Sequence, residues 1–371
     1  MRIALYSHVF PPHIGGSGTR AKLLAEGFAE LGHAVTVMTC TSSSTGEATY
    51  PFRLVRRPTL RQLWTVFAHS DLVLTIGPCM TAGFLARAMF KPLVIAHPMF
   101  PARGMRGLAT QVLCTGVPNL APSRALARAL PTPATVIPNP YDEGVFQNRT
   151  AAGDRKHGVV FVGRLIKEKG LQILLSALDL LRQRGLVLDL TVVGPGPAAE
   201  TCKEISRNLG LDRQVTFVGA ASPAQIAEIY NTHKIAVVPS LCEEGFGLVA
   251  LEAIACGCAV VGSISGGLPE AIGPCGLTYP KMSISDLASR LEQLTTEPRL
   301  LDVMQSYAKD HLAQRTRVVV AARYLTFIGD CFPALASPDG GAGSLLPGPV
   351  ELPAPPARGI SKTAETVPAN G

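Results

Sequence analysis

The chain has 371 residues, a formal net charge of +7, 47% hydrophobic residues and only 16% charged residues. This length suits two domains better than one, and the apolar content is sufficient for two large cores. No apolar run approaches the roughly 18 residues that a membrane span needs, and the nine cysteines are odd in number and scattered. These properties argue against a membrane-spanning protein and a disulfide framework. We expect a cytoplasmic chain whose cysteines are small, reduced core residues.

The positive charge is concentrated near the N-terminus. Residues 1–150 carry 14 Lys/Arg and 6 Asp/Glu, whereas residues 151–330 carry 18 of each. Two explanations of this distribution are equally good. The charge either favours solubility or contacts an anionic membrane surface or a phosphate-bearing partner. Nucleic acid is a less suitable partner, because the basic residues are not interleaved with aromatic ones.

Residues 1–150 alternate short apolar runs with a helical pattern. The first run, RIALYS, is more typical of a strand than of a signal peptide, because no long apolar segment with a cleavage site follows it. A Gly/Pro loop and one helical pattern come next. The alternation predicts βαβ units and a parallel sheet covered on both faces. The predicted strands are residues 2–7, 33–39, 71–76, 91–97 and 134–139, and the predicted helix is residues 19–32.

The same rhythm restarts after a polar linker near residues 140–158. We therefore predict an α/β chain of two doubly wound, Rossmann-like domains, residues 1–150 and 151–330, facing each other across a cleft. The Pro/Gly/Ala-rich residues 331–371 are expected to be disordered. Predicted strands of the second domain are residues 159–165, 188–196, 214–219, 234–240 and 259–263, and predicted helices are residues 170–185, 199–210, 223–232, 247–256, 285–294 and 299–312.

In the segment SLCEEGFGLVALEAIACG, two glutamates, Glu244 and Glu252, are separated by seven residues. Glu244 lies on the loop after a predicted strand, and Glu252 lies within the helix that we expect to begin near Phe246 or Gly247. A helix start with free N–H groups is an anion site. Glycine permits a phosphate to approach the backbone closely. The two carboxylates would then accept hydrogen bonds from sugars on either side of a diphosphate.

Two cations near the same sheet edge can offset these carboxylates. Arg164 and Lys169 follow the first strand of the second domain in VVFVGRLIKEKG. Arginine suits bidentate phosphate contacts and lysine acts as a point charge. Taken alone, either residue is equally well explained as a solvated loop charge.

Several motifs together resemble a known family. GRLIKEKG, FVG, VVPS, EEGFGLVALEAIACG and GGLPE resemble the C-terminal donor domain of the retaining GT-B glycosyltransferases of family 4. PPHIGGSGTRAKLLAEGFAELGHAVTV and VIPNPYDEGVF are similar to the N-terminal domain and hinge of that family. The resemblance covers roughly residues 1–330. It implies a GT-B fold with an acceptor-side domain, a donor domain and a nucleotide diphosphate sugar as co-substrate.

The resemblance also implies roles for individual residues. Arg164 and Lys169 would hold the donor diphosphate, Glu244 would contact the transferred sugar, and His97 would lie beside that sugar. Arg164, Lys169, Glu244 and His97 are thus the catalytic candidates. The donor-binding candidates are Gly15 and Gly16 at the first-domain loop, Val218 and Gly219 at the base, the backbone of Phe246, Gly247 and Leu248 at the phosphates, and Glu252 at the ribose.

Some of these residues have plainer explanations. A histidine at a strand end is often structural, and we expect His8 and His13 not to bind ligand. The glycine loop fits neither G-x4-G-K nor G-x-G-x-x-G. Tyr230 and Trp64 are expected to be packing residues.

Pro140 replaces the glycine that is usual in the hinge motif. The connections after Thr39 and His97 look short, and the stretch Arg53, Arg56, Arg57, Arg61 and Trp64 is either a membrane contact or a solvated loop.

The resemblance implies transfer by same-face attack, in which the leaving diphosphate helps to remove the acceptor proton. No D-x-D motif is present, so we expect no metal and no other cofactor. The acceptor would be a hydroxyl of an envelope glycan, a glycolipid or a secondary metabolite. A nucleotide-sugar epimerase, a phosphorylase and a non-catalytic nucleotide-sugar binding module are the alternatives.

Overall fold

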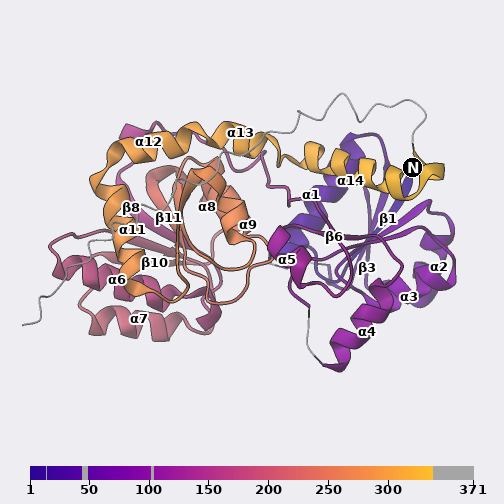
Figure 1. Cartoon of the computed structure of the whole chain (residues 1–371), viewed down its shortest axis with the longest axis horizontal. Coiled ribbons are helices and arrows are strands. Elements are labelled where there is room, and N and C mark those ends of the chain that lie inside the picture. Colours follow the sequence, from indigo (N-terminus) through magenta and orange to yellow (C-terminus); the bar gives the residue numbers. More distant parts are fainter. Residues whose placement is uncertain (14, 44–48, 102–103, 337–371) are drawn as a thin grey trace, which may run out of the picture.

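The computed structural model describes residues 1–13, 15–43, 49–101 and 104–336, which form two α/β lobes side by side (Figure 1). Most of the predicted disordered tail, and parts of the two short connections after Thr39 and His97, lie outside these residues. The two lobes confirm the predicted α/β class. All nine cysteines are free thiols, and five of them are buried: Cys114, Cys202, Cys256, Cys258 and Cys275.

The first lobe contains a seven-stranded parallel sheet in the order β3-β2-β1-β4-β5-β6-β7. The order reverses between β1 and β4, which is the switch point where doubly wound sheets bind ligands. The strands are β1 (Arg2–Ser7), β2 (Ala34–Thr39), β3 (Arg53–Arg56), β4 (Leu72–Ile76), β5 (Leu93–Ala96), β6 (Asn119–Ala121) and β7 (Thr135–Val136).

Helices cover both faces of this sheet because successive strand residues point to opposite faces. Ile3 and Leu5 of β1 join one buried cluster, with α1 and α14, and Ala4 and Tyr6 join the other, with α2, α3 and α4. Figure 1 shows the two helical layers on opposite sides of the strands. The helices are α1 (Gly16–Glu30), α2 (Leu60–Ala68), α3 (Met80–Ala88), α4 (Met105–Cys114), α5 (Arg124–Ala129) and α14 (Arg317–Cys331).

The second lobe contains a six-stranded parallel sheet in the order β10-β9-β8-β11-β12-β13. One face packs on α6, α7 and α11 and the other on α8, α9 and α10. The strands are β8 (His157–Val162), β9 (Leu190–Val193), β10 (Val215–Gly219), β11 (His233–Val238), β12 (Ala259–Ser263) and β13 (Gly276–Tyr279). The helices are α6 (Leu171–Gln183), α7 (Ala199–Asn208), α8 (Pro223–Thr232), α9 (Leu248–Ala255), α10 (Leu268–Ile272), α11 (Ile284–Thr296), α12 (Pro298–Ser306) and α13 (Ala308–Ala313).

The stretch of residues 53–64 is not a loop. Arg53–Arg56 is edge strand β3, and the following residues form α2, which begins with a capping box between Thr59 and Gln62. Trp64 was expected to pack in the core, but its side chain is 54% exposed because α2 buries Leu63 and Phe67 instead. Tyr230, by contrast, is buried as predicted.

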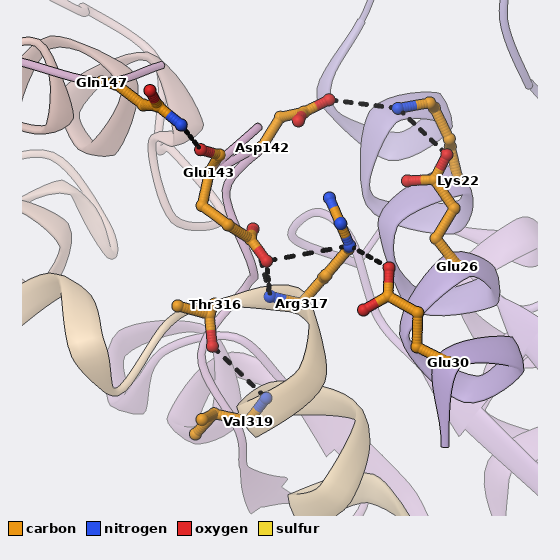
Figure 2. A network of polar contacts seen from close by, with 9 residues as sticks. All are labelled: Lys22, Glu26, Glu30, Asp142, Glu143, Gln147, Thr316, Arg317 and Val319. Atoms are coloured by element: carbon orange, nitrogen blue, oxygen red, sulfur yellow. Dashed lines mark hydrogen bonds and ion pairs between the residues drawn. The ribbon is translucent and has the colours of Figure 1, made fainter. Parts of the chain in front are cut away.

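The chain returns to the first lobe at its C-terminal end. Helix α14, which the sequence pattern did not identify, packs along α1 and contributes Val320, Tyr324 and Ile328 to the first-lobe core. The predicted boundary at residue 330 assigned this segment to the second domain, whereas its apolar side chains are buried in the first. A charged network joins α1, the linker after β7 and the start of α14 (Figure 2).

Candidate functional site

The loop between β11 and α9 forms the centre of the candidate site. Gly247 is the N-cap of α9 and has a φ of +109°, which favours glycine. A Cβ atom on it would lie 2.7 Å from Leu268 Cδ1. Among the residues that the structure describes, no backbone carbonyl accepts from the N–H groups of Gly247 or Leu248. The positive end of α9 is therefore available to an anion.

Glu244 is held on this loop by two side chains. Its Oε1 atom lies 2.6 Å from Lys169 Nζ and 2.5 Å from Ser240 Oγ, which donates to it. The Gly267 N–H donates to the Glu244 carbonyl over 2.7 Å. Lys169 was assigned to a diphosphate, and the structure pairs it with Glu244 instead. Ser240 was missed as a site residue, although its place four residues before Glu244 at the end of β11 was a usable signal.

Arg164 lies at the carboxyl end of β8, on the same edge of the sheet. Its side chain is exposed, and it forms no ion pair within the described part of the chain. The turn Lys167–Lys169 is tied to the central loop because Leu241 N–H donates to the Glu168 carbonyl over 2.8 Å. The site therefore has one unpaired cation and one cation whose charge is shared with a carboxylate.

Glu252 lies on α9 and is partly buried. Burial, with a smaller contribution from the nearby Asp142 carboxylate, raises the pKa of Glu252 to about 7. No donor among the described residues hydrogen-bonds to it. A partly buried carboxylate without a partner is suited to accept hydrogen bonds from a ligand.

A cavity of about 320 Å³ opens at the carboxyl ends of β9 and β10. Val218 and Gly219, the predicted base-binding pair, line it together with Phe217, Leu165 and Pro195. The Val218 side chain is 46% exposed. The apolar walls and backbone polar groups of the cavity suit a flat heterocycle.

The first lobe faces this loop at close range. A Cβ atom on Gly16, the first residue of α1, would lie 3.5 Å from Leu248 Cδ1, and one on Gly245 would lie 2.3 Å from the Pro98 carbonyl. Gly15 is the N-cap of α1. The carboxyl ends of both sheets thus meet at the site, and the glycines permit their close approach.

His97 follows β5 at this junction, but only 2% of it is exposed. Burial lowers the pKa of His97, which favours the neutral ring. His8 and His13 are exposed. Gly15, Gly16 and His97 come from the first lobe, and the other nine predicted residues come from the second.

Comparison with known proteins finds sequence similarity over the second lobe. Residues 144–311 match the family model described as glycosyl transferases group 1. The D-inositol 3-phosphate glycosyltransferase of Corynebacterium aurimucosum is 36% identical over 181 residues, covering 46% of this chain and 42% of the relative. The GDP-mannose-dependent alpha-(1-6)-phosphatidylinositol monomannoside mannosyltransferase of Mycolicibacterium smegmatis is 31% identical over 219 residues, covering 55% and 57%.

Solved structures match both lobes. Sucrose-phosphate synthase from Thermosynechococcus elongatus aligns with a TM-score of 0.74 at 20% identity, covering 90% of this chain and 99% of that one. Anabaena HepE in complex with UDP aligns with a TM-score of 0.76 at 18% identity, covering 89% and 100%. At such identities the likeness concerns the fold alone, and it confirms the GT-B architecture. The sequence matches, in contrast, span about half the length of the two named relatives.

Proposed function

We propose that the chain is a retaining glycosyltransferase of family 4 that moves a hexose from a nucleotide diphosphate sugar to a hydroxyl acceptor. The observation that carries this proposal is the convergence, at one sheet edge, of an apolar cavity, a helix N-terminus, an arginine and a carboxylate, the last three without partners among the described residues. Each of these suits one part of a nucleotide sugar. The family match of residues 144–311 supports it.

In this proposal the base occupies the cavity at Val218 and Gly219, and Glu252 accepts from the ribose hydroxyls. The diphosphate binds at Arg164 and the N–H groups at the start of α9. Lys169 turns from Glu244 to the diphosphate, which frees Glu244 to accept from the transferred sugar. Structures of HepE with UDP and with UDP-glucose support a nucleotide-sugar ligand for this fold.

Transfer would proceed on one face of the sugar, without a metal or other cofactor. The bond between the anomeric carbon and the diphosphate oxygen breaks while the acceptor oxygen bonds to the same carbon. The acceptor proton passes to a diphosphate oxygen. Arg164, Lys169 and the α9 dipole stabilise the charge that develops on the leaving group, and preorganised charges of this kind are a major source of catalysis.

Arg164→Ala tests the proposal, with Lys167→Ala as the matched control because Lys167 is an exposed cation on the same turn. We expect Arg164→Ala to lower kcat by about 100-fold, on the order found when a charge-stabilising donor is removed, and Lys167→Ala to change it little. Near-wild-type turnover of Arg164→Ala would remove this residue from the mechanism. Conversion of the donor without an acceptor would identify an epimerase, and donor binding without transfer would identify a binding module.

The surface of the first lobe supports a proposal for the acceptor and for the location of the enzyme. Among the described residues, no helix combines the length and apolar character needed to cross a bilayer. Between Glu47 and Asp142 the sequence has one carboxylate, Asp71, and Arg2 pairs with it. This part of the first lobe is therefore poor in negative charge. The outer surfaces of its helices α2 and α4 also carry exposed apolar side chains: Leu60, Trp64, Met105, Leu108 and Val112. We therefore place the enzyme at the cytoplasmic face of a membrane, acting on a glycolipid or envelope glycan.

Trp64 provides a direct assay because it is the only tryptophan in the chain. Its fluorescence should shift to the blue on addition of vesicles containing anionic phospholipid, and less with purely zwitterionic vesicles. An unchanged spectrum with both vesicle types would remove the membrane contact from the proposal and leave the transfer reaction untouched.

A further inference from the structure

The ring of His97 is held by a neighbouring amide. His97 Nε2 lies 3.0 Å from Asn119 Oδ1, and both side chains are buried. His97 follows β5, and Asn119 begins β6, which pairs with β5. The contact is therefore built between two adjacent strands at the edge where the lobes meet.

Hydrogen bonding on the far side of Asn119 determines the tautomer of His97. Asn119 Nδ2 donates to the carbonyls of Cys114 at 3.0 Å and Val117 at 2.7 Å. Carbonyl oxygens only accept, so the amide nitrogen must face them and Oδ1 must face His97. An amide oxygen also only accepts. Nε2 of His97 therefore carries the proton, and in the neutral ring Nδ1 has the free lone pair.

The surroundings of His97 favour this neutral form. Arg20 is 1% exposed and donates from Nη1 to the His97 carbonyl over 2.9 Å. Burial and the Arg20 charge lower the pKa of His97, and the contact with Asn119 opposes them in part. The thiol of Cys114 also lies against the ring, 3.9 Å from Nε2. Burial raises the pKa of that thiol to about 11, so it stays neutral.

Nδ1 is the ring atom left for a ligand. It has no hydrogen-bond partner within the described residues. The next residue, Pro98, lies against Gly245 of the donor-side loop.

We propose that Asn119 is a positioning residue that holds His97 as an acceptor through Nδ1 for one hydroxyl of the transferred sugar. This rests on the proposed glycosyl transfer. An acceptor at that point favours a hydroxyl, which can donate a proton, over a carboxylate, which can only accept. The residue pair therefore selects neutral hexoses over sugars that carry a carboxylate there.

The tautomer can be measured without any substrate. In protein labelled with nitrogen-15 at histidine, long-range proton–nitrogen correlation distinguishes protonated from unprotonated ring nitrogens, and His97→Gln identifies the relevant signals. At pH 7.5 we expect Nε2 protonated and Nδ1 unprotonated. A proton on Nδ1, alone or with one on Nε2, would overturn the inference whatever the enzyme's reaction proves to be.

A kinetic experiment tests the role in transfer. Asn119→Ala should lower kcat/KM for the nucleotide sugar about tenfold, while the affinity for the nucleoside diphosphate, which lacks the sugar, should stay within twofold. Ser70→Ala is the control because it also removes a buried side-chain hydrogen bond from the first lobe, to the Val66 carbonyl. An unchanged kcat/KM in Asn119→Ala, or an equal loss of nucleoside diphosphate affinity, would contradict a positioning role.

Discussion

The two lobes meet at two places that differ in construction. On the hinge side, Lys22 contacts Glu26 at 3.3 Å and Asp142 at 3.1 Å. In the same network Arg317 lies 2.6 Å from Glu30 and 3.7 Å from Glu143 (Figure 2). On the cleft side, the contacts are single hydrogen bonds. Ser123 Oγ donates to the Gly245 carbonyl at 2.8 Å, and the N–H groups of Arg124 and Ala125 donate to Glu270 at 3.0 and 3.1 Å.

This difference indicates which junction opens. The hinge network links three elements, and close packing of α1 on α14 accompanies it. None of the buried apolar clusters of the described residues joins the two sheets across the cleft. Polar contacts without apolar burial exchange readily with water. We therefore expect the lobes to open at the cleft and to pivot at the hinge, as domain closure in enzymes commonly does.

Of the variants considered, Gly245→Ala should have the largest effect on kcat, because it prevents the lobes from meeting at the cleft. The added Cβ would lie 2.3 Å from the Pro98 carbonyl, so the lobes could not reach the same approach. A displacement of about 1 Å can reduce a rate 100-fold, and we expect a loss of that order in kcat. The thermal midpoint should change little because the clash disappears when the lobes open.

Gly153→Ala is the matched control, since its Cβ would meet no atom within 4 Å. X-ray scattering should report a larger radius of gyration for Gly245→Ala in the presence of a nucleoside diphosphate. A variant that still closes and turns over normally would show that the cleft contact is not required.

Glu252 provides the second test, because burial raises its pKa and Asp142 of the hinge network adds to that shift. Ionised Glu252 can accept from both ribose hydroxyls, whereas the protonated form can accept less. With a pKa of about 7, KM for the nucleotide sugar should fall by up to about tenfold between pH 6 and pH 8. Glu252→Gln should abolish this dependence, and Asp142→Asn should move it to lower pH.

The same raised pKa affects stability in the opposite direction, because it makes the folded protein less stable as pH rises. The folded state holds the Glu252 proton up to about pH 7, whereas the unfolded carboxyl has a pKa near 4.5. The free energy of unfolding contributed by this group should therefore fall as pH rises between those values. Urea denaturation of wild type and Glu252→Gln at pH 5 and pH 7.5 measures it. A wild-type pH profile identical to that of Glu252→Gln would contradict the raised pKa.

The second lobe was more predictable from sequence than the first. Its strands are buried apolar runs, and its site residues stand in three short motifs, GRLIKEKG, FVG and EEGFGLVALE. All of its predicted strands and helices are present, although residues 299–312 divide into α12 and α13, and α10 and β13 were missed. In the first lobe β3, β6, α2, α3, α4, α5 and α14 were not predicted. Arg53–Arg56 has one neighbouring strand and alternates little, and α2 exposes apolar side chains that obscure its period.

Contacts between residues that are far apart in the sequence could not be predicted either. Asn119 acquires a role only when β6 lies beside β5, and Lys169 meets Glu244 only through the turn that Glu168 ties to the loop after β11. The approximate location of the site was predictable because the carboxyl ends of parallel strands share an edge. The pairing of individual polar atoms there depends on loop conformation, which no periodicity specifies.

Glu270→Ala should weaken the cleft junction by a smaller amount. It removes the acceptor for two N–H groups at the start of α5, but Ser123 still caps that helix through Leu126 N–H. A net hydrogen-bond contribution of about 1 kcal/mol corresponds to about a fivefold lower population of closed enzyme. We expect kcat/KM to fall by that factor, with a stability close to wild type. A fall as large as that of Gly245→Ala would mean that Glu270 has a further role.

Arg317→Met should have the smallest effect on transfer, because the hinge retains the Lys22 contacts and the packing of α14 on α1. The variant loses its contacts with Glu30 and Glu143. Burial raises the pKa of Glu143, and the Arg317 charge opposes that shift, so the loss leaves a partly buried carboxylate without its cation. The Arg317 side chain is 25% exposed, so we expect the free energy of unfolding to fall by only about 1 kcal/mol. Urea denaturation measures this against Arg299→Met, an exposed residue of α12. If Arg317→Met instead abolished transfer while the protein stayed folded, the hinge would govern catalysis directly and the contrast between the two junctions would be wrong.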